Sequence, residues 1–229
     1  MNKQTWGSIL ALSLLLTGCN GTTEEEKAKA EKPTEETKKH DHNHTKLSET
    51  QKQIYAGYFK DEQVKSRKLS DWAGDWQSVY PYLLDGTLDE VFTYKAKKDN
   101  SMTAEAYKKY YKKGYKTSIE HIKIKGNQVT FTEKGKEATG TYKENGYEIL
   151  TYEKGNRGVR YIFKLVEKDS NLPTYIQFSD HSISPTASSH YHIYLGNNRA
   201  NLLKEVTNWP TFYPSSMNGH TIAHEMIAH

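Results

Sequence analysis

The sequence predicts one mainly β domain, an antiparallel barrel or sandwich with added helices. Seven short runs rich in β-branched and aromatic residues follow one another in the second half of the chain. Turn signals separate them at hairpin spacing, which is typical of antiparallel sheets. Apolar residues recur at helical spacing before and after this series. With 229 residues, the chain has room for one such domain and for processing segments.

Helical patterns are expected in three regions before the strands and in one region after them. The first helix begins at a Ser-x-x-Gln capping sequence that starts at Ser48. Its apolar face is marked by Ile54, Tyr55, Tyr58 and Phe59. A second helical region runs over 79–96 with one interruption, and a third runs over 103–113 and ends at Gly114. The tail over 218–229 has the pattern of a terminal helix.

The expected strands are, in chain order, 117–124, 128–132, 138–143, 147–152, 157–166, 174–179 and 189–195. Asn145-Gly146 is the strongest hairpin signal among the turns between them. Gly74-Asp75-Trp76 is a Gly-x-Trp pattern, similar to the start of the first barrel strand in lipocalin-like proteins. The chain has 17 tyrosines, and we expect them to fill and line a small β-rich domain.

The first residues are typical of an export signal that ends in a lipid-modified cysteine. Lys3 is followed by a short apolar run, and Leu16-Thr17-Gly18-Cys19 resembles the bacterial lipoprotein box. We therefore expect 1–18 to be a lipoprotein signal peptide and Cys19 to carry the lipid that anchors the chain. The alternative is a chance cysteine after a hydrophobic stretch. Cys19 is the single cysteine, so any metal site must use His, Asp and Glu.

Residues 19–46 are expected to form a disordered tether, and 47–229 to form the folded domain. The tether lacks aromatic residues and cannot bury enough apolar surface to fold. It ends in a tract that contains His40, His42 and His44. Such a tract is a compositional signal for metal binding, weaker than a preformed site, although a plain polar linker is the alternative. The net charge of +4 and the export signal argue against nucleic-acid binding.

Three histidines form the strongest candidate site. His190 and His192 are two residues apart on one expected strand, so both imidazoles project from one face, about 6.5 Å apart along the strand. His181 ends the preceding strand, and antiparallel pairing through the loop that contains Pro185 would bring it beside them. Three imidazoles can hold Zn²⁺ and leave a fourth tetrahedral position for water, a carboxylate or a partner's ligand. Binding should weaken below about pH 6. The alternative is that His190 and His192 are ordinary half-buried strand residues.

The remaining histidines carry weaker signals. His224 and His229 flank a sequence similar to a zinc-protease helix, but their spacing of five rotates them about 140° apart. His220 and His224 share a helical face and could form an auxiliary site. His229 could reach the main site only if the last turn frays. His121 stands alone on an expected strand, where a core or surface role is favoured.

Several long motifs resemble the ZinT (YodA) family of bacterial zinc-binding proteins, and the resemblance covers about 47–229. They are Leu69-Ser70-Asp71-Trp72, Asp75-Trp76-Gln77-Ser78-Val79-Tyr80-Pro81, Gly146-Tyr147-Glu148-Ile149-Leu150-Thr151-Tyr152, Gly158-Val159-Arg160-Tyr161, Tyr175-Ile176-Gln177-Phe178-Ser179-Asp180-His181, Ser188-Ser189-His190-Tyr191-His192 and Asn208-Trp209-Pro210-Thr211-Phe212-Tyr213-Pro214. The resemblance implies a lipocalin-like (calycin) antiparallel β-barrel with added N-terminal and C-terminal helices. It also implies a metal site at His181, His190 and His192.

Family resemblance further implies a function in zinc acquisition. Members bind Zn²⁺, accept Cd²⁺ and other divalent transition metals, and support a zinc ABC importer and its solute-binding protein. We therefore expect a non-enzymatic zinc-capture lipoprotein on the extracellular face of a Gram-positive cell membrane. This sequence departs from the family in two ways. It lacks the cysteine pair of periplasmic members, and it has His220 and His224 where acidic residues are usual.

Two other functions stay open at this point. A lipocalin-like carrier of a small apolar ligand would need a dry, roomy cavity, whereas the tyrosines and compact strands predict a filled interior. A zinc hydrolase is conceivable because three histidines and a water are also the catalytic arrangement of carbonic anhydrase. We do not expect an enzyme, since neither a paired glutamate nor a Ser/His constellation stands near the histidines in the sequence.

Overall fold

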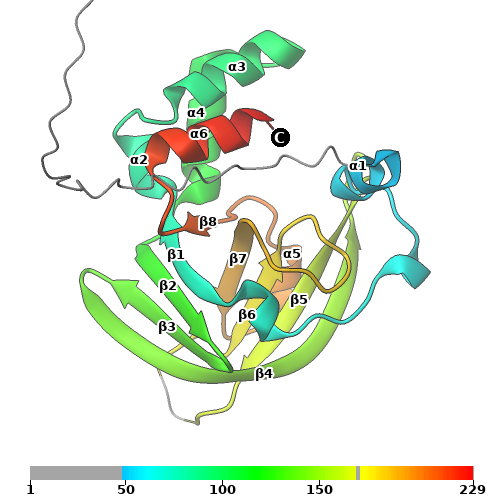
Figure 1. Cartoon of the computed structure of the whole chain (residues 1–229), viewed down its shortest axis with the longest axis vertical. Helices are drawn as coiled ribbons and strands as arrows, with labels where there is room; N and C mark the ends of the chain where they lie inside the picture. Colours follow the sequence, from blue (N-terminus) through cyan, green and yellow to red (C-terminus); the bar gives the residue numbers. More distant parts are fainter. Residues whose placement is uncertain (1–47, 169–170, 229) are drawn as a thin grey trace, which may run out of the picture. The chain divides into compact units, whose positions relative to one another are not determined.

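Eight antiparallel strands close into a barrel in which each strand pairs with its neighbours in the chain (Figure 1). The strands are β1 (Gly74–Ser78), β2 (Ile119–Lys125), β3 (Gln128–Glu133), β4 (Lys136–Thr151), β5 (Arg157–Leu165), β6 (Tyr175–Ser179), β7 (Tyr191–Gly196) and β8 (Thr211–Pro214). Pairing of β1 with β8, with Gln77 opposite Tyr213, closes the cylinder. Of the two architectures that the sequence left open, the barrel is therefore the one that forms.

The computed structural model describes residues 48–168 and 171–228, all within one unit, Thr45–His229. The predicted signal peptide, Cys19, the histidine tract of the tether and His229 lie outside the described residues. None of the helices in the described part is both long enough and apolar enough to cross a membrane.

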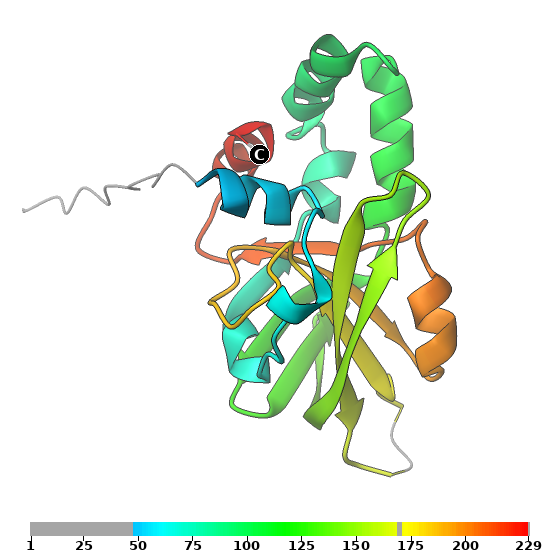
Figure 2. The ribbon, with the colours of Figure 1, turned by 90° about the vertical axis from the view of Figure 1, so that its right-hand side faces the viewer.

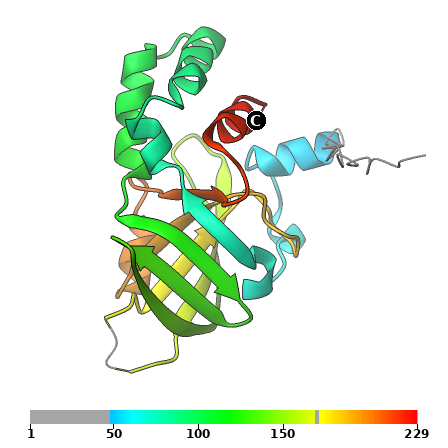
Figure 3. The ribbon, with the colours of Figure 1, turned by 60° about the vertical axis from the view of Figure 1, so that its left-hand side comes forward.

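Four of the helices gather at one end of the barrel, as Figures 1 to 3 all show. These are α2 (Tyr80–Leu84), α3 (Asp89–Asp99), α4 (Ala104–Tyr115) and α6 (Gly219–Ala228). Helix α1 (Glu49–Tyr55) begins with the expected capping box, in which the Ser48 hydroxyl accepts from the Gln51 N–H and the Gln51 side chain accepts from the Ser48 N–H. Helix α5 (Arg199–Lys204) follows β7 and was not predicted.

The prediction of a hairpin at Asn145-Gly146 was wrong. Strand β4 runs through these residues without a break and pairs with β5 on both sides of them. Between Glu144 and Tyr147 the register shifts, so the pair forms a β-bulge, with Gly146 at a φ of 80°. Gly146 thus supplies the expected positive φ, but continuous pairing with β5 overrides the local preference for a turn.

Gly114 does not end its helix, contrary to expectation, because α4 continues to Tyr115. A Cβ at position 114 would stand 2.3 Å from the Trp209 ring, so glycine is required for close packing and not for a helix stop. The Asn208 side chain donates to three backbone carbonyls at the end of this helix, those of Lys113, Gly114 and Lys116. The segment that leads into β8 is therefore fixed to α4.

Two smaller differences concern the ends of elements. Helix α1 ends at Tyr55, so Tyr58 lies beyond the helix. Tyr58 is exposed and is not part of the apolar face of α1, contrary to expectation. Strand β7 begins at Tyr191, which places His190 just before the strand. Strand β8 was not predicted as a strand, because it has only four residues and ends in a proline.

Two hydrophobic cores lie on opposite sides of β8, with Phe212 in the first and Tyr213 in the second. The first fills the barrel and is rich in aromatic rings, including Trp72, Tyr161, Phe163 and Phe178. The second packs the helices α2, α3, α4 and α6 against the outer side of the barrel wall, where Tyr213 joins it. The expected filled interior is confirmed for the barrel.

Candidate metal centre

The structure brings His181, His190 and His192 together, and we call these three residues the histidine cluster. One potential ligand nitrogen from each lies within 4.8 Å of the others. The ring centroids are 5.7 to 6.1 Å apart. Pairing of β6 with β7, with Ser179 opposite His192, produces this approach in the way the sequence predicts. Three imidazole nitrogens at this separation can close on one ion with short Zn–N bonds.

The histidine cluster lies on the outside of the barrel wall. Tyr191 and Phe212 are fully buried in the barrel interior, where their rings stack at 5.7 Å. Side chains alternate along a strand, so His192 on β7 and Thr211 and Tyr213 on β8 point the other way, toward the helices. The site therefore sits between the barrel wall and the helical layer, and not in the barrel cavity.

His181 is held by a loop whose conformation depends on a buried ion pair. We call residues 180–190 the site loop. The Arg67 guanidinium is fully buried and donates to Asp180 Oδ1 at 2.6 Å, and the same oxygen accepts from the Ser182 N–H at 3.2 Å. His181 itself has a φ of 63°, a left-handed conformation that non-glycine residues adopt only when their surroundings impose it.

Further bonds fix the middle of the site loop. Arg67 donates to the Thr186 carbonyl at 2.8 Å and to the Asp71 carboxylate at 2.9 Å. Asp71 in turn accepts from the backbone N–H of Thr186, and its own carbonyl accepts from that of Ser188. The site loop is thus bound along its length to the segment before β1, which limits the motion of the histidines at its two ends.

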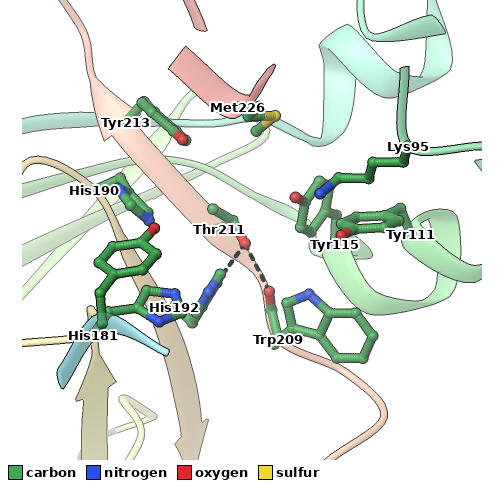
Figure 4. A pocket seen from close by; sticks show the side chains of 11 residues that line it. Lys95, Tyr111, Tyr115, His181, His190, His192, Trp209, Thr211, Tyr213 and Met226 are labelled. Carbon is green, nitrogen blue, oxygen red and sulfur yellow. Dashed lines mark hydrogen bonds between the residues drawn. The ribbon is translucent and has the colours of Figure 1, made fainter. Parts of the chain in front are cut away.

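A hydrogen-bond chain sets the tautomer of His192. Its Nδ1 lies 2.8 Å from the Thr211 hydroxyl, which donates to the Trp209 carbonyl at 3.0 Å (Figure 4). Because the hydroxyl proton is committed to Trp209, the hydroxyl oxygen accepts from His192, so Nδ1 carries the proton. Nε2 is left with its lone pair available for a metal, and the partner on the other nitrogen is the usual way to orient a metal-binding imidazole.

Aromatic rings orient the other two imidazoles. The His190 ring stacks on Tyr213 with centroids 5.0 Å apart and planes 9° from parallel. His181 stacks on Tyr55 of α1 at 4.4 Å and 19°. His190 is buried and His181 is exposed, so the histidine cluster reaches from the interior of the site to the surface.

Burial favours the neutral forms of the groups in the centre. It lowers the pKa of His192 well below the usual 6.5, and the charges of His181, His190 and Arg160 lower it further. Burial also raises the pKa of the Tyr55 phenol to about 12, with a contribution from Asp180. A neutral imidazole is the form that binds a metal, so His192 is ready to act as a ligand near neutral pH.

The remaining candidates are placed differently. His220 and His224 are exposed on α6, and the described residues contain no third potential ligand that joins them in a cluster. His121 is exposed on β2, as a surface role would require. Thr211, Tyr55 and Tyr213 are the site residues that the sequence did not single out. Thr211 and Tyr213 belong to one of the long motifs, which was the available signal for them.

Comparison with known proteins identifies the family of the chain. Residues 50–229 match the family described as ZinT (YodA) periplasmic lipocalin-like zinc-recruitment. The chain belongs to the ZinT family. Over 181 residues it is 66% identical to the probable metal-binding protein YrpE of Bacillus subtilis, a match that covers 79% of this chain and 72% of that protein. It is 49% identical to the zinc-binding lipoprotein AdcA of Streptococcus pneumoniae, with 80% of this chain and 36% of AdcA covered.

Solved structures of ZinT domains share the fold. The crystal structure of the Zn(II)-bound ZinT-like domain of Streptococcus pneumoniae AdcA matches with a TM-score of 0.74 and 49% identity, covering 76% of this chain and 97% of that domain. The crystal structure of Zn(II)-bound AdcA from the same organism matches with a TM-score of 0.75 and 50% identity, covering 77% of this chain but 38% of AdcA. The expected family and the lipocalin-like barrel are therefore confirmed, and this chain corresponds to little more than a third of AdcA.

Proposed function

We propose that this chain is a zinc-capture lipoprotein that binds Zn²⁺ through His181, His190 and His192. The observation that carries the proposal is the meeting of three imidazole nitrogens within 4.8 Å, on β7 and on the bonded site loop that joins β6 to β7. Zn²⁺ suits such a set, and Cd²⁺ or other divalent transition metals would also be accepted. The names of YrpE and AdcA, and the Zn(II)-bound state of the AdcA structures, support the same ion.

Delivery to a zinc ABC importer is the second part of the proposal. The exposed edge of the histidine cluster at His181 would let a partner's ligand approach the ion, so transfer could proceed without opening the barrel. The receiving partner would be the solute-binding protein of the importer. Lipidation of Cys19 would hold the chain at the extracellular face of the membrane, and the lipoprotein name of the AdcA relative supports that location.

Zinc titration calorimetry tests the first part. The chain without its predicted signal peptide and Cys19, residues 20–229, should bind one Zn²⁺ tightly at the histidine cluster. Replacement of all three cluster histidines by Ala should abolish this event. The matched control is His121→Ala, an exposed histidine outside the cluster, which should bind as tightly as the wild type. Tight binding in the triple variant would refute the assignment.

The histidine tract of the tether requires its own variant. We expect His40→Ala/His42→Ala/His44→Ala to remove only weaker binding, since ordering a flexible segment costs entropy. The lipid anchor is tested by Cys19→Ala in the full chain, which should appear in the culture medium and not in the membrane fraction. Zinc transfer to a purified importer solute-binding protein, followed with a competing chelator, tests delivery.

The two other functions have less support. The aromatic side chains that fill the barrel occupy the volume where a lipocalin-like carrier would hold its ligand. If the protein were a zinc hydrolase, the zinc-loaded wild type would have higher esterase or hydratase activity than the His190→Ala variant. We expect equal activities.

A further inference from the structure

The histidine cluster forms only one side of the pocket in which it lies. The pocket encloses about 270 Å³ between the barrel wall and the helices (Figure 4). Its other side consists of Lys95 from α3, Tyr111 and Tyr115 from α4, Trp209 before β8 and Met226 from α6. None of these five side chains is needed to hold a metal, and the volume is far larger than one ion requires. The pocket is slightly smaller than the usual range for ligand sites, about 300–1,000 Å³, so it suits a small ligand.

The pocket contains a cation and no anion among its described lining residues. Lys95 is half-buried and Figure 4 shows its amine directed into the pocket, 5.6 Å from the Tyr111 ring centroid. Within the described part of the chain Lys95 forms no salt bridge. Burial lowers the pKa of Lys95, which the nearby charge of Asp99 opposes. The pocket thus holds a positive charge that is only partly solvated.

The phenols that line the pocket cannot supply the missing negative charge. Burial raises the pKa of the Tyr111 and Tyr115 phenols, so both remain neutral near pH 7. The carboxylates nearest to them are already engaged. Asp180 is paired with Arg67, and Asp99 accepts hydrogen bonds from Tyr107 and Ser101. Glu225 on α6 is likewise not a free carboxylate.

We propose that the pocket binds a small organic carboxylate together with Zn²⁺, with the anion placed between the metal and the Lys95 ammonium. This inference rests on the proposed zinc site. Zn²⁺ on three neutral imidazoles would add two positive charges to a pocket that already holds the Lys95 ammonium, and burying like charges without a counter-ion is costly. A carboxylate oxygen would bind the metal, and the Lys95 ammonium across the pocket would attract the anion. The rings of Trp209 and Tyr111 leave an apolar surface for its carbon chain.

The effect of Lys95 on zinc affinity should change sign when a carboxylate is present. Without a carboxylate, the ammonium repels the incoming ion, so Lys95→Met should bind Zn²⁺ at least as tightly as the wild type. With a carboxylate present, the wild type gains an attraction between the anion and the Lys95 ammonium that the variant lacks. Because binding free energies are linked, the carboxylate must then strengthen zinc binding by the same factor by which zinc strengthens carboxylate binding.

Cobalt in place of zinc makes the anion visible. Residues 20–229 carrying His40→Ala/His42→Ala/His44→Ala are loaded with Co²⁺, and sodium acetate is added at constant ionic strength while the d–d absorption is followed. We expect a saturable spectral change in this background. Lys95→Met should weaken acetate binding about fivefold, which corresponds to about 1 kcal/mol of attraction between the two charges. Lys97→Met, on the exposed side of the same helix, removes an equal charge and should leave acetate binding unchanged.

The outcomes separate this inference from the zinc assignment. If Co²⁺ and Zn²⁺ bind but acetate changes neither the spectrum nor the zinc affinity, the carboxylate site is refuted and the zinc site stands. If Lys95→Met and Lys97→Met weaken acetate binding equally, the effect is general attraction and the inference also fails. If neither metal binds to the background chain, the proposed function itself is wrong.

Discussion

The two sides of the wall formed by β7 and β8 have opposite characters, although they alternate residue by residue. On the inner side, Tyr191 and Phe212 are fully buried and stack on each other within a continuous aromatic core. On the outer side, His192 and Tyr213 face the helices and line a pocket of about 270 Å³. One short strand pair therefore contributes both to the packing of the barrel and, through His192, to the candidate site.

The barrel acts here as a support for the site and does not contain it. A close-packed interior resists deformation, so the wall that carries His192 is stiff. The site itself lies where that wall meets a bonded loop and a helical layer, which leaves room for an ion and keeps His181 within reach of a partner. Stability and metal binding should then be separable by mutation on opposite sides of the wall.

A paired experiment tests this separation and should give the largest effects. Phe163→Ala removes an interior ring that packs on Trp72 and Phe178, and we expect a loss of about 3–5 kcal/mol in the free energy of unfolding. Its zinc stoichiometry should stay unchanged while the chain is folded. His192→Ala removes a proposed metal ligand. It should lower zinc affinity by more than the roughly 10–100-fold that is lost when a residue hydrogen-bonded to a ligand is replaced. Its metal-free stability should fall by only about 1 kcal/mol, the value of its hydrogen bond to Thr211.

Urea unfolding of the metal-free proteins and zinc competition with a chromophoric chelator provide the two measurements. If Phe163→Ala weakened zinc binding as much as His192→Ala did, the interior and the site would not be independent, and the description of the barrel as a passive support would fail.

Arg67 should be the exception to the separation, because it connects both sides. Its guanidinium lies over the Trp72 ring at 4.0 Å and is also the partner of Asp180 beside His181. Arg67→Met would leave the Asp180 carboxylate buried and unpaired, at a cost of about 3–5 kcal/mol. We expect zinc affinity to fall as well, since the site loop loses the bonds that hold His181.

The double variant Arg67→Met/Asp180→Asn is the control. It removes the unpaired charge, so part of the stability should return, while zinc affinity should stay low because the bond from Arg67 to the Thr186 carbonyl is still missing. Zinc affinity equal to the wild type in folded Arg67→Met would show that the site loop keeps its conformation without this ion pair.

The sequence was sufficient to predict the histidine cluster because its geometry is local. His190 and His192 are two residues apart, and one hairpin with a short loop brings in His181, so strand periodicity and antiparallel pairing settle the arrangement. The barrel was also within reach, since each strand pairs with its neighbour in the chain. Two pairs, β1 with β2 across three helices and β1 with β8 at the closure, join segments that are distant in sequence.

The parts that were missed depend on contacts between distant segments. Asn145-Gly146 carries a genuine turn signal, yet continuous pairing with β5 makes it a bulge. Gly114 looked like a helix stop and instead admits the Trp209 ring. Lys95 and Tyr111 reach the pocket only because α3 and α4 fold back over the barrel wall, a placement for which local periodicity provides no information.

Thr211→Val, on the outer side of the wall, should have a smaller effect on zinc affinity. Thr211 is buried, and its hydroxyl connects His192 to the Trp209 carbonyl. Valine has nearly the same shape but leaves the His192 Nδ1–H without its acceptor. We expect zinc affinity to fall roughly 10–100-fold. Thr211→Ser retains the hydroxyl and should lose much less affinity in the same competition assay, and equal losses in the two variants would assign the effect to packing.

The smallest expected effect is a pH dependence of metal-free stability that originates on the outer side of the wall. The pKa of His192 is lowered in the folded chain by burial and by the charges around it, whereas the unfolded chain should titrate near the usual value of about 6.5. Above that value both states are neutral at His192, and this residue contributes no pH dependence. As the pH falls below it, the unfolded chain takes up a proton before the folded chain does, so the free energy of unfolding should decrease. His192→Asn cannot titrate and should show a shallower slope in urea unfolding between about pH 6.5 and 5. An identical slope in the wild type and the variant would mean that protonation of His192 is not opposed by the fold.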